Sequence, residues 1–188
     1  MFNPNRSGKI EAVSDLKEDT KLAIELEKKG YEFYRETAGK TKNPLAASTL
    51  SSLADREQLH IERIYEFFQN LTGEKILKSD WLSKVEVPPT KAELLKPILS
   101  KLKGSLDKKF ETKEDINEAY RVAEGLERDS FTLYEKISSE TDNETARKFY
   151  SALAMEEREH FEILEDTLLY LNDPGEWYRR TERWIVEG

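Results

Sequence analysis

The stretch Leu53-Ala54-Asp55-Arg56-Glu57-Gln58-Leu59-His60 decides how this sequence is interpreted, because it recurs one hundred residues later as Leu153-Ala154-Met155-Glu156-Glu157-Arg158-Glu159-His160. Each copy places a Glu and a His three residues apart. On a helix, this spacing puts both side chains on one face, one turn apart. The chain contains 2 histidines in all, and both lie in these two motifs. The duplicated Glu-x-x-His element is therefore the first candidate for a metal site.

The repeat extends well beyond the two motifs. A glutamate precedes each motif glutamate by 30 residues, and these are Glu27 and Glu127. Further identical pairs at the same offset are Asp15/Asp115, Ala23/Ala123, Tyr34/Tyr134, Asn43/Asn143, Ala46/Ala146 and Leu71/Leu171. Self-similarity over this length indicates two copies of one supersecondary unit.

Apolar residues recur at steps of three, four or seven in four segments, which predicts four amphipathic helices. Residues 1–13 are polar and show no period, so we expect a non-helical arm before a helix that starts at Ser14 or Asp15. We expect a first helical hairpin over residues 14–73 and a second over residues 112–173. Residues 74–111 form a long crossover in this prediction, with one short helix from about Lys91 to Lys103.

The predicted fold is all-α, with one domain over residues 1–188. A short turn makes the helices of each hairpin antiparallel, and the long crossover lets the third helix start at the far end of the bundle. The result is a four-helix bundle plus a short C-terminal helix. That last helix is an aromatic tail over residues 174–188, in which Trp177, Tyr178 and Trp184 dock on the bundle or on a partner.

Composition excludes several functions. A net charge of −8 argues against nucleic acid or an anionic membrane surface as a partner. With no cysteine, the chain cannot hold a thiolate zinc site or an iron–sulfur cluster of its own. No segment approaches the roughly 20 apolar residues of a membrane span, and the N-terminus lacks the apolar run of a signal peptide. We therefore expect a cytoplasmic protein with no membrane partner.

The four glutamates are expected to meet at mid-bundle. Glu27 and Glu57 each lie about 15 residues from the first predicted turn, which at ~1.5 Å per residue puts both near 22 Å from it. The same arithmetic places Glu127 beside Glu157. Pairing the hairpins face to face would collect four carboxylates and two imidazoles in the core.

Such a cluster needs compensating positive charge, because four carboxylates cannot all ionise together in a low dielectric. The four apolar stripes contain no Lys or Arg that could supply it. Two divalent cations would balance four carboxylates, and oxygen ligands with two imidazoles suit iron or manganese, with zinc as a further candidate. The predicted metal ligands are Glu27, Glu57, His60, Glu127, Glu157 and His160. One such motif alone would more often be a solvated helix face.

Two tyrosines lie two turns after the first ligand of each hairpin, and these are Tyr34 and Tyr134. Helical side chains lean toward the N-terminus, so each tyrosine can either hydrogen-bond a ligand carboxylate or simply pack in the core.

These residues resemble the ferritin-like superfamily, and within it the rubrerythrin-type di-iron proteins. The resemblance covers the four helices, about residues 15–72 and 115–172, and all six expected ligand positions are filled. The segments that carry it are Glu27 to Tyr34, Leu53 to His60, Glu127 to Tyr134 and Leu153 to His160.

Two departures from that family shape the functional expectation. Rubrerythrins proper carry a four-cysteine rubredoxin domain that feeds electrons to the site, and this chain has no cysteine. They also tend to place a further Glu one turn after the third-helix ligand, where this chain has Ser130. The resemblance nevertheless implies two iron ions, an external electron-donor protein and a homodimer.

Three functions stay open at the level of sequence. The first is an oxidoreductase that reduces peroxide or dioxygen at a carboxylate-bridged di-metal centre. The second is iron handling, in which the same centre oxidises Fe(II) or buffers it. The third is a structural bundle whose helices are held together by metal.

Overall fold

The structure is a computed structural model that describes residues 4–73, 100 and 112–187. Five helices lie within these residues. They are α1 (Pro4–Lys40), α2 (Pro44–Thr72), α5 (Lys113–Glu140), α6 (Glu144–Asn172) and α7 (Pro174–Glu187). The described part of the chain contains no strand. The all-α four-helix bundle with a short C-terminal helix is therefore confirmed.

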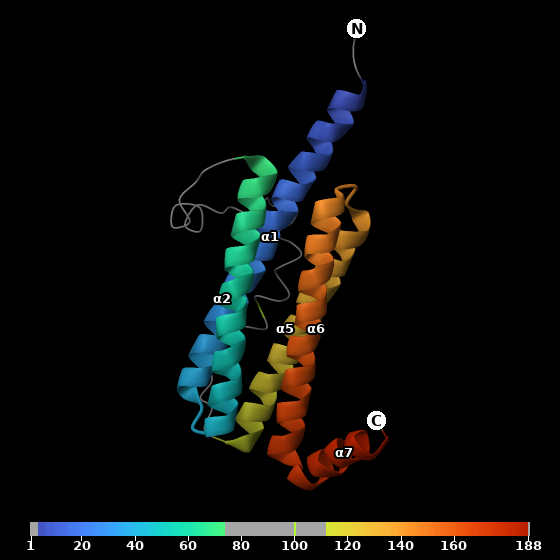
Figure 1. Ribbon diagram of the computed structural model, residues 1–188. Helices are drawn as coiled ribbons and strands as arrows, with labels where there is room; N and C mark the ends of the chain where they lie inside the picture. The colour runs from blue at the N-terminus through green and yellow to red at the C-terminus, as the bar shows by residue number, and fades with distance from the viewer. Residues whose placement is uncertain (1–3, 74–99, 101–111, 188) are drawn as a thin grey trace.

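The bundle consists of two antiparallel hairpins that lie side by side (Figure 1). Helix α1 packs mainly against α2, and α5 mainly against α6, while α1 meets α5 and α2 meets α6 across the seam between the hairpins. The α1–α2 turn lies at one end of the bundle and the α5–α6 turn at the other. The two hairpins thus run in opposite directions, as a long crossover requires.

Local sequence sets the ends of these helices. The Asn43 side chain accepts a hydrogen bond from the backbone N–H of Ala46, at 3.0 Å, and Pro44 occupies the first turn. Gly73 ends α2 with φ 69°, a left-handed conformation that glycine adopts without strain. In the second hairpin, Thr112 forms a capping box with Asp115, and Asn143 caps α6 just as Asn43 caps α2.

The beginning of α1 differs from the prediction. We expected a helix start at Ser14 or Asp15 after a non-helical arm, and this was wrong because α1 already begins at Pro4. Proline is well suited to a first helical turn, where its missing N–H costs nothing. The polar residues that follow lack an apolar period, but only Gly8 among them disfavours a helix. The lack of an apolar period in this stretch thus did not mark a break in the helix.

The crossover cannot be compared with its prediction. Residues 74–111 lie outside the described residues apart from Ser100, and with them the short helix expected near Lys91 to Lys103. The expected aromatic tail is helical and packs on α6. Trp177 donates a hydrogen bond of 2.7 Å to Asp166 and packs edge-on against Tyr170, whereas the side chain of Trp184 is outside the described residues.

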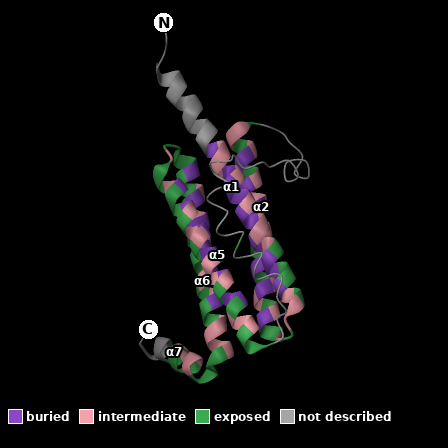
Figure 2. Cartoon of the chain, turned by 180° about the vertical axis from the view of Figure 1, so that it is seen from behind, coloured by how far each residue is buried: buried purple, intermediate pink, exposed green. Residues whose placement is uncertain are grey.

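The core divides into two apolar clusters, one toward each end of the bundle, and residues on the inner faces of all four long helices are buried (Figure 2). On α2, Ala54 belongs to one cluster and Ile61 to the other. On α6, Ala154 likewise belongs to one cluster and Leu164 to the other. The segments between these residues contain both Glu-x-x-His motifs, so apolar packing closes the site from both ends.

No helix among the described residues combines the length and apolar character needed to cross a membrane.

Candidate metal centre

The structure brings all six predicted ligand residues together at mid-bundle. Each of the four long helices contributes, with one glutamate from α1, one from α5, and a Glu-x-x-His pair from each of α2 and α6. The side chains are almost completely buried, with exposed fractions of 0–4% for Glu27, Glu57, His60, Glu127, Glu157 and His160. Ligand-capable atoms of Glu57, His60, Glu157 and His160 all lie within 4.8 Å of one another.

His60 turns its Nδ1 atom toward the centre of the cluster. This atom lies 3.2 Å from Oε2 of Glu27 and 3.0 Å from Oε1 of Glu157. The first contact stays within one hairpin, while the second crosses the seam from α2 to α6. His60 therefore connects the ligands of the two halves.

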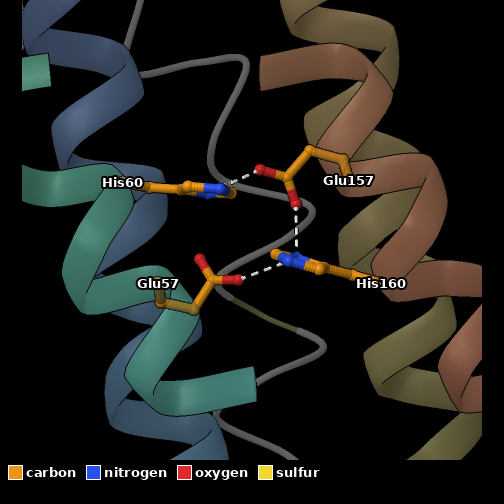
Figure 3. A group of neighbouring side chains, drawn as sticks. All are labelled: Glu57, His60, Glu157 and His160. Atoms are coloured by element: carbon orange, nitrogen blue, oxygen red, sulfur yellow. Dashed lines mark ion pairs between the residues drawn. The ribbon is translucent and has the colours of Figure 1, made fainter. Parts of the chain in front are cut away.

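His160 presents the same atom from the opposite side. Its Nδ1 lies 3.5 Å from Oε1 of Glu57, 3.5 Å from Oε2 of Glu127 and 3.3 Å from Oε2 of Glu157. The two imidazole rings stack at 5.2 Å between centroids. Figure 3 shows how Glu157 faces both rings, with one oxygen toward each.

The two tyrosines cross the seam in a reciprocal pattern. Tyr34 on α1 donates a hydrogen bond to Glu127 on α5, and Tyr134 on α5 donates one to Glu27 on α1. Burial and the nearby carboxylate charge raise the pKa of both phenols well above the ordinary value. Both hydroxyls therefore stay protonated and act as donors. Each fixes one oxygen of a carboxylate whose other oxygen faces an imidazole.

Protons supply the missing positive charge when no metal is bound. Burial and the negative charge of Glu157 raise the pKa of Glu127 to about 8, and burial with the charge of Glu27 raises that of Glu57. Burial alone would lower the pKa of His160, but the neighbouring carboxylates of Glu127 and Glu157 raise it to about 12. A bound metal would displace these protons, because ligand carboxylates and imidazoles bind it in deprotonated form.

Buried atoms without a hydrogen bond indicate what the cluster can accept. In the part of the chain that the structure describes, Oε1 of Glu57, both carboxylate oxygens of Glu157 and both ring nitrogens of His160 make none. Buried polar groups are rarely left in this state, and each needs an explanation. Metal ligation supplies one, since four of these five atoms face the centre of the cluster.

Gly30 makes room for one of these carboxylates. A Cβ atom at this position would lie 3.0 Å from Oε2 of Glu57 and 3.4 Å from Leu126. The absence of a side chain one turn after Glu27 thus lets the Glu57 carboxylate occupy the centre. Donor set, unbonded atoms and available space together fit a di-metal site.

Two residues at the edge of the site were missed from the sequence. Glu156 on α6 accepts a hydrogen bond of 3.1 Å from Nε2 of His60, and Arg63 on α2 binds the same carboxylate. Both lie off the apolar stripes, where a charged residue is normally solvated. One signal in the sequence could have pointed to this edge of the site. Glu156 occupies the repeat position equivalent to Arg56, so the charge at this position is reversed between the two halves.

Comparison with known proteins agrees with this geometry. The family model described as Rubrerythrin matches residues 20–168, which span all four long helices and all six candidate ligands. No curated protein and no solved structure matches the sequence. The match covers most of the chain, and the protein therefore belongs to the rubrerythrin family of ferritin-like carboxylate proteins.

Proposed function

We propose that the protein is a di-iron oxidoreductase that reduces a small oxidant, peroxide or dioxygen, with electrons from an external donor. The observation that carries this proposal is the buried set of four carboxylates and two imidazoles, with Nδ1 of both histidines directed at the carboxylate of Glu157. Mixed oxygen and imidazole ligands suit iron, with manganese and zinc as other candidates. Two bound iron ions would supply redox equivalents and Lewis acidity.

The residues of this chain would divide the work of holding that centre. Glu157 faces both imidazoles with different oxygens and is suited to bridge two ions. Glu27 with His60, and Glu127 with His160, would complete one position each. Tyr34 and Tyr134 orient the carboxylates of Glu127 and Glu27, and the two apolar clusters keep bulk water away from the centre.

A direct experiment loads the purified protein with Fe(II) under anaerobic conditions and measures metal content and reductant-driven loss of hydrogen peroxide or dioxygen. We expect two iron ions per chain and catalytic consumption of the oxidant. The double variant Glu57→Ala/His160→Ala should lose both. Glu162→Ala serves as a control, because it removes an exposed carboxylate of α6 that pairs with Arg158.

The proposal fails if the protein takes up no transition metal, or if loaded protein consumes neither oxidant. A bundle held together by metal alone would show a third pattern. In that case the double variant would lower the melting temperature, and neither protein would show redox activity.

Iron handling is the second candidate, and one observation favours it. Gly30 and Ser130 occupy equivalent positions one turn after Glu27 and Glu127, and neither adds a further carboxylate to the site. The centre is thus more symmetric than the peroxide-reducing members of the family imply. Repeated additions of Fe(II) in air discriminate between the two functions. Continued Fe(II) oxidation without added reductant supports iron handling, and dependence on a reductant supports the first proposal.

A further inference from the structure

The surroundings of the two imidazoles differ, although their ligand contacts are alike. Nε2 of His60 points away from the centre and donates to Oε2 of Glu156 across the seam, at 3.1 Å. Glu156 is fixed in turn by Arg63, whose Nη1 lies 2.7 Å from both carboxylate oxygens. Arg63 follows His60 on the same helix. Glu156 on α6 thus binds both His60 and Arg63 on α2, and we call these three residues the triad.

Among the described residues, the second imidazole has no such partner. At the offset of the repeat, Arg56 stands in place of Glu156 and Ile163 in place of Arg63. Arginine has no acceptor atom, and isoleucine has no polar atom. Nε2 of His160 is buried and makes no hydrogen bond in the part of the chain that the structure describes. The internal symmetry of the bundle is thus broken next to the centre.

The hydrogen bond at Nε2 determines what Nδ1 can do. A proton held at Nε2 by a carboxylate leaves the lone pair of Nδ1 available for a metal, and the bond also fixes the rotation of the ring. A carboxylate partner makes the imidazole a stronger donor as well. His60 receives all three effects from Glu156. His160 receives none of them from an equivalent residue.

We propose that Glu156, held by Arg63, is a positioning residue for His60 and makes the two metal positions unequal, so that the His60 position fills first and the His160 position exchanges more easily. This inference rests on the di-metal centre proposed above. It adds an order in which the two metal positions fill, which the symmetric set of ligands alone would not predict. Loss of a partner of this kind typically lowers metal affinity 10- to 100-fold.

The test is an anaerobic titration of the metal-free protein with Co(II) in competition with a chelator, followed by visible absorption. Wild-type protein should bind two equivalents in two separate steps. Glu156→Ala should weaken the first step by about 10- to 100-fold and leave the second unchanged. Arg56→Glu with Ile163→Arg places the triad beside His160, and it should strengthen the second step. Glu162→Ala, which breaks the exposed pair with Arg158, should behave as wild type.

A second readout separates positioning from simple support of the fold. The chain has 2 histidines, so Zn(II)-loaded protein labelled with ¹⁵N gives two resolvable imidazole spin systems. His60 should show a slowly exchanging Nε2 proton that disappears in Glu156→Ala, while the signals of His160 stay in place. A merely structural role would instead weaken both Co(II) steps equally and leave the slowly exchanging Nε2 proton of His60 in place.

Two results would overturn the inference while leaving the metal centre intact. One is equal binding of both equivalents by wild-type protein, and the other is an unchanged first step in Glu156→Ala. Failure of wild-type protein to bind any Co(II) would instead overturn the metal centre itself, and the inference with it.

Discussion

Without metal, the protein should become less stable as the pH rises toward neutrality. The pKa of Glu127 lies near 8 in the folded protein, against 4.5 as its ordinary value. Between these two values the folded state binds more protons than the unfolded chain, so the free energy of unfolding falls with pH. His160, whose pKa is raised to about 12, acts in the same direction above pH 6.5.

The size of the effect follows from the shift. Each pKa unit corresponds to roughly 1.4 kcal/mol, so a rise from about pH 5 to about pH 7.5 removes about 3 kcal/mol through Glu127 alone. For a domain of this size, that lowers the melting temperature by roughly 6–12 °C. The opposite shift of Glu156, whose pKa a hydrogen bond from His60 lowers to about 2, matters only below pH 4.5.

The assay is thermal unfolding of the metal-free protein between pH 5 and pH 8, followed by circular dichroism. Glu127→Gln removes the titrating group yet leaves an oxygen that can accept from Tyr34. This variant should show a flatter profile and exceed wild type in stability at pH 7.5, although it binds metal more weakly. Added metal should stabilise wild type more at pH 7.5 than at pH 5, since its ligands must be deprotonated. A metal-free melting temperature that stays constant or rises over this range would refute the reasoning.

Three further variants test the geometry of the site and of its frame. Gly30→Ala should weaken metal binding, because the new Cβ would lie 3.0 Å from Oε2 of Glu57, whereas Gly125→Ala meets nothing within 4 Å and should bind metal as wild type. Equal metal affinity of the two alanine variants, measured by competition with a chelator, would contradict the role of Gly30. Tyr134→Phe removes the hydrogen-bond donor to the buried Glu27 carboxylate and should lower metal affinity about 10-fold or more. An affinity within twofold of wild type would mean that the tyrosine only packs in the core. Asn43→Ala removes the cap of α2 and should lower the free energy of unfolding by about 1 kcal/mol without changing metal affinity. A change in metal affinity would mean that the turn also shapes the site.

The sequence predicted the features that depend on helical periodicity and on local chemistry. Helix α2 ends at Gly73, where the first hairpin was expected to end, because a helix end is set by neighbouring residues only. The shared height of Glu27 and Glu57 followed from the rise of a helix and the position of one turn. Glu27 contacts His60 and Glu57 contacts His160, which agrees with the shared height that such counting implies.

Features that depend on the seam between the hairpins were beyond such reasoning. Glu156 reaches His60 from the other hairpin, and no spacing within one helix marks it. The exchange of hydrogen bonds by Tyr34 and Tyr134 needed the same information, and for that reason the sequence left packing open as their role. The early start of α1 was missed for another cause, since a helix that projects beyond its neighbours needs no apolar stripe.

The division of the centre between two similar hairpins has an evolutionary consequence. One hairpin carries half of the ligands, and two copies packed face to face would supply the complete set. A gene for a single hairpin could thus have encoded a working homodimer before duplication and fusion. Such a fusion would replace an encounter between two chains by a tethered one at high effective concentration. It would also free the two halves to differ, and in the present chain they do differ beside the histidines, where Arg56 and Glu156 occupy equivalent positions of the repeat.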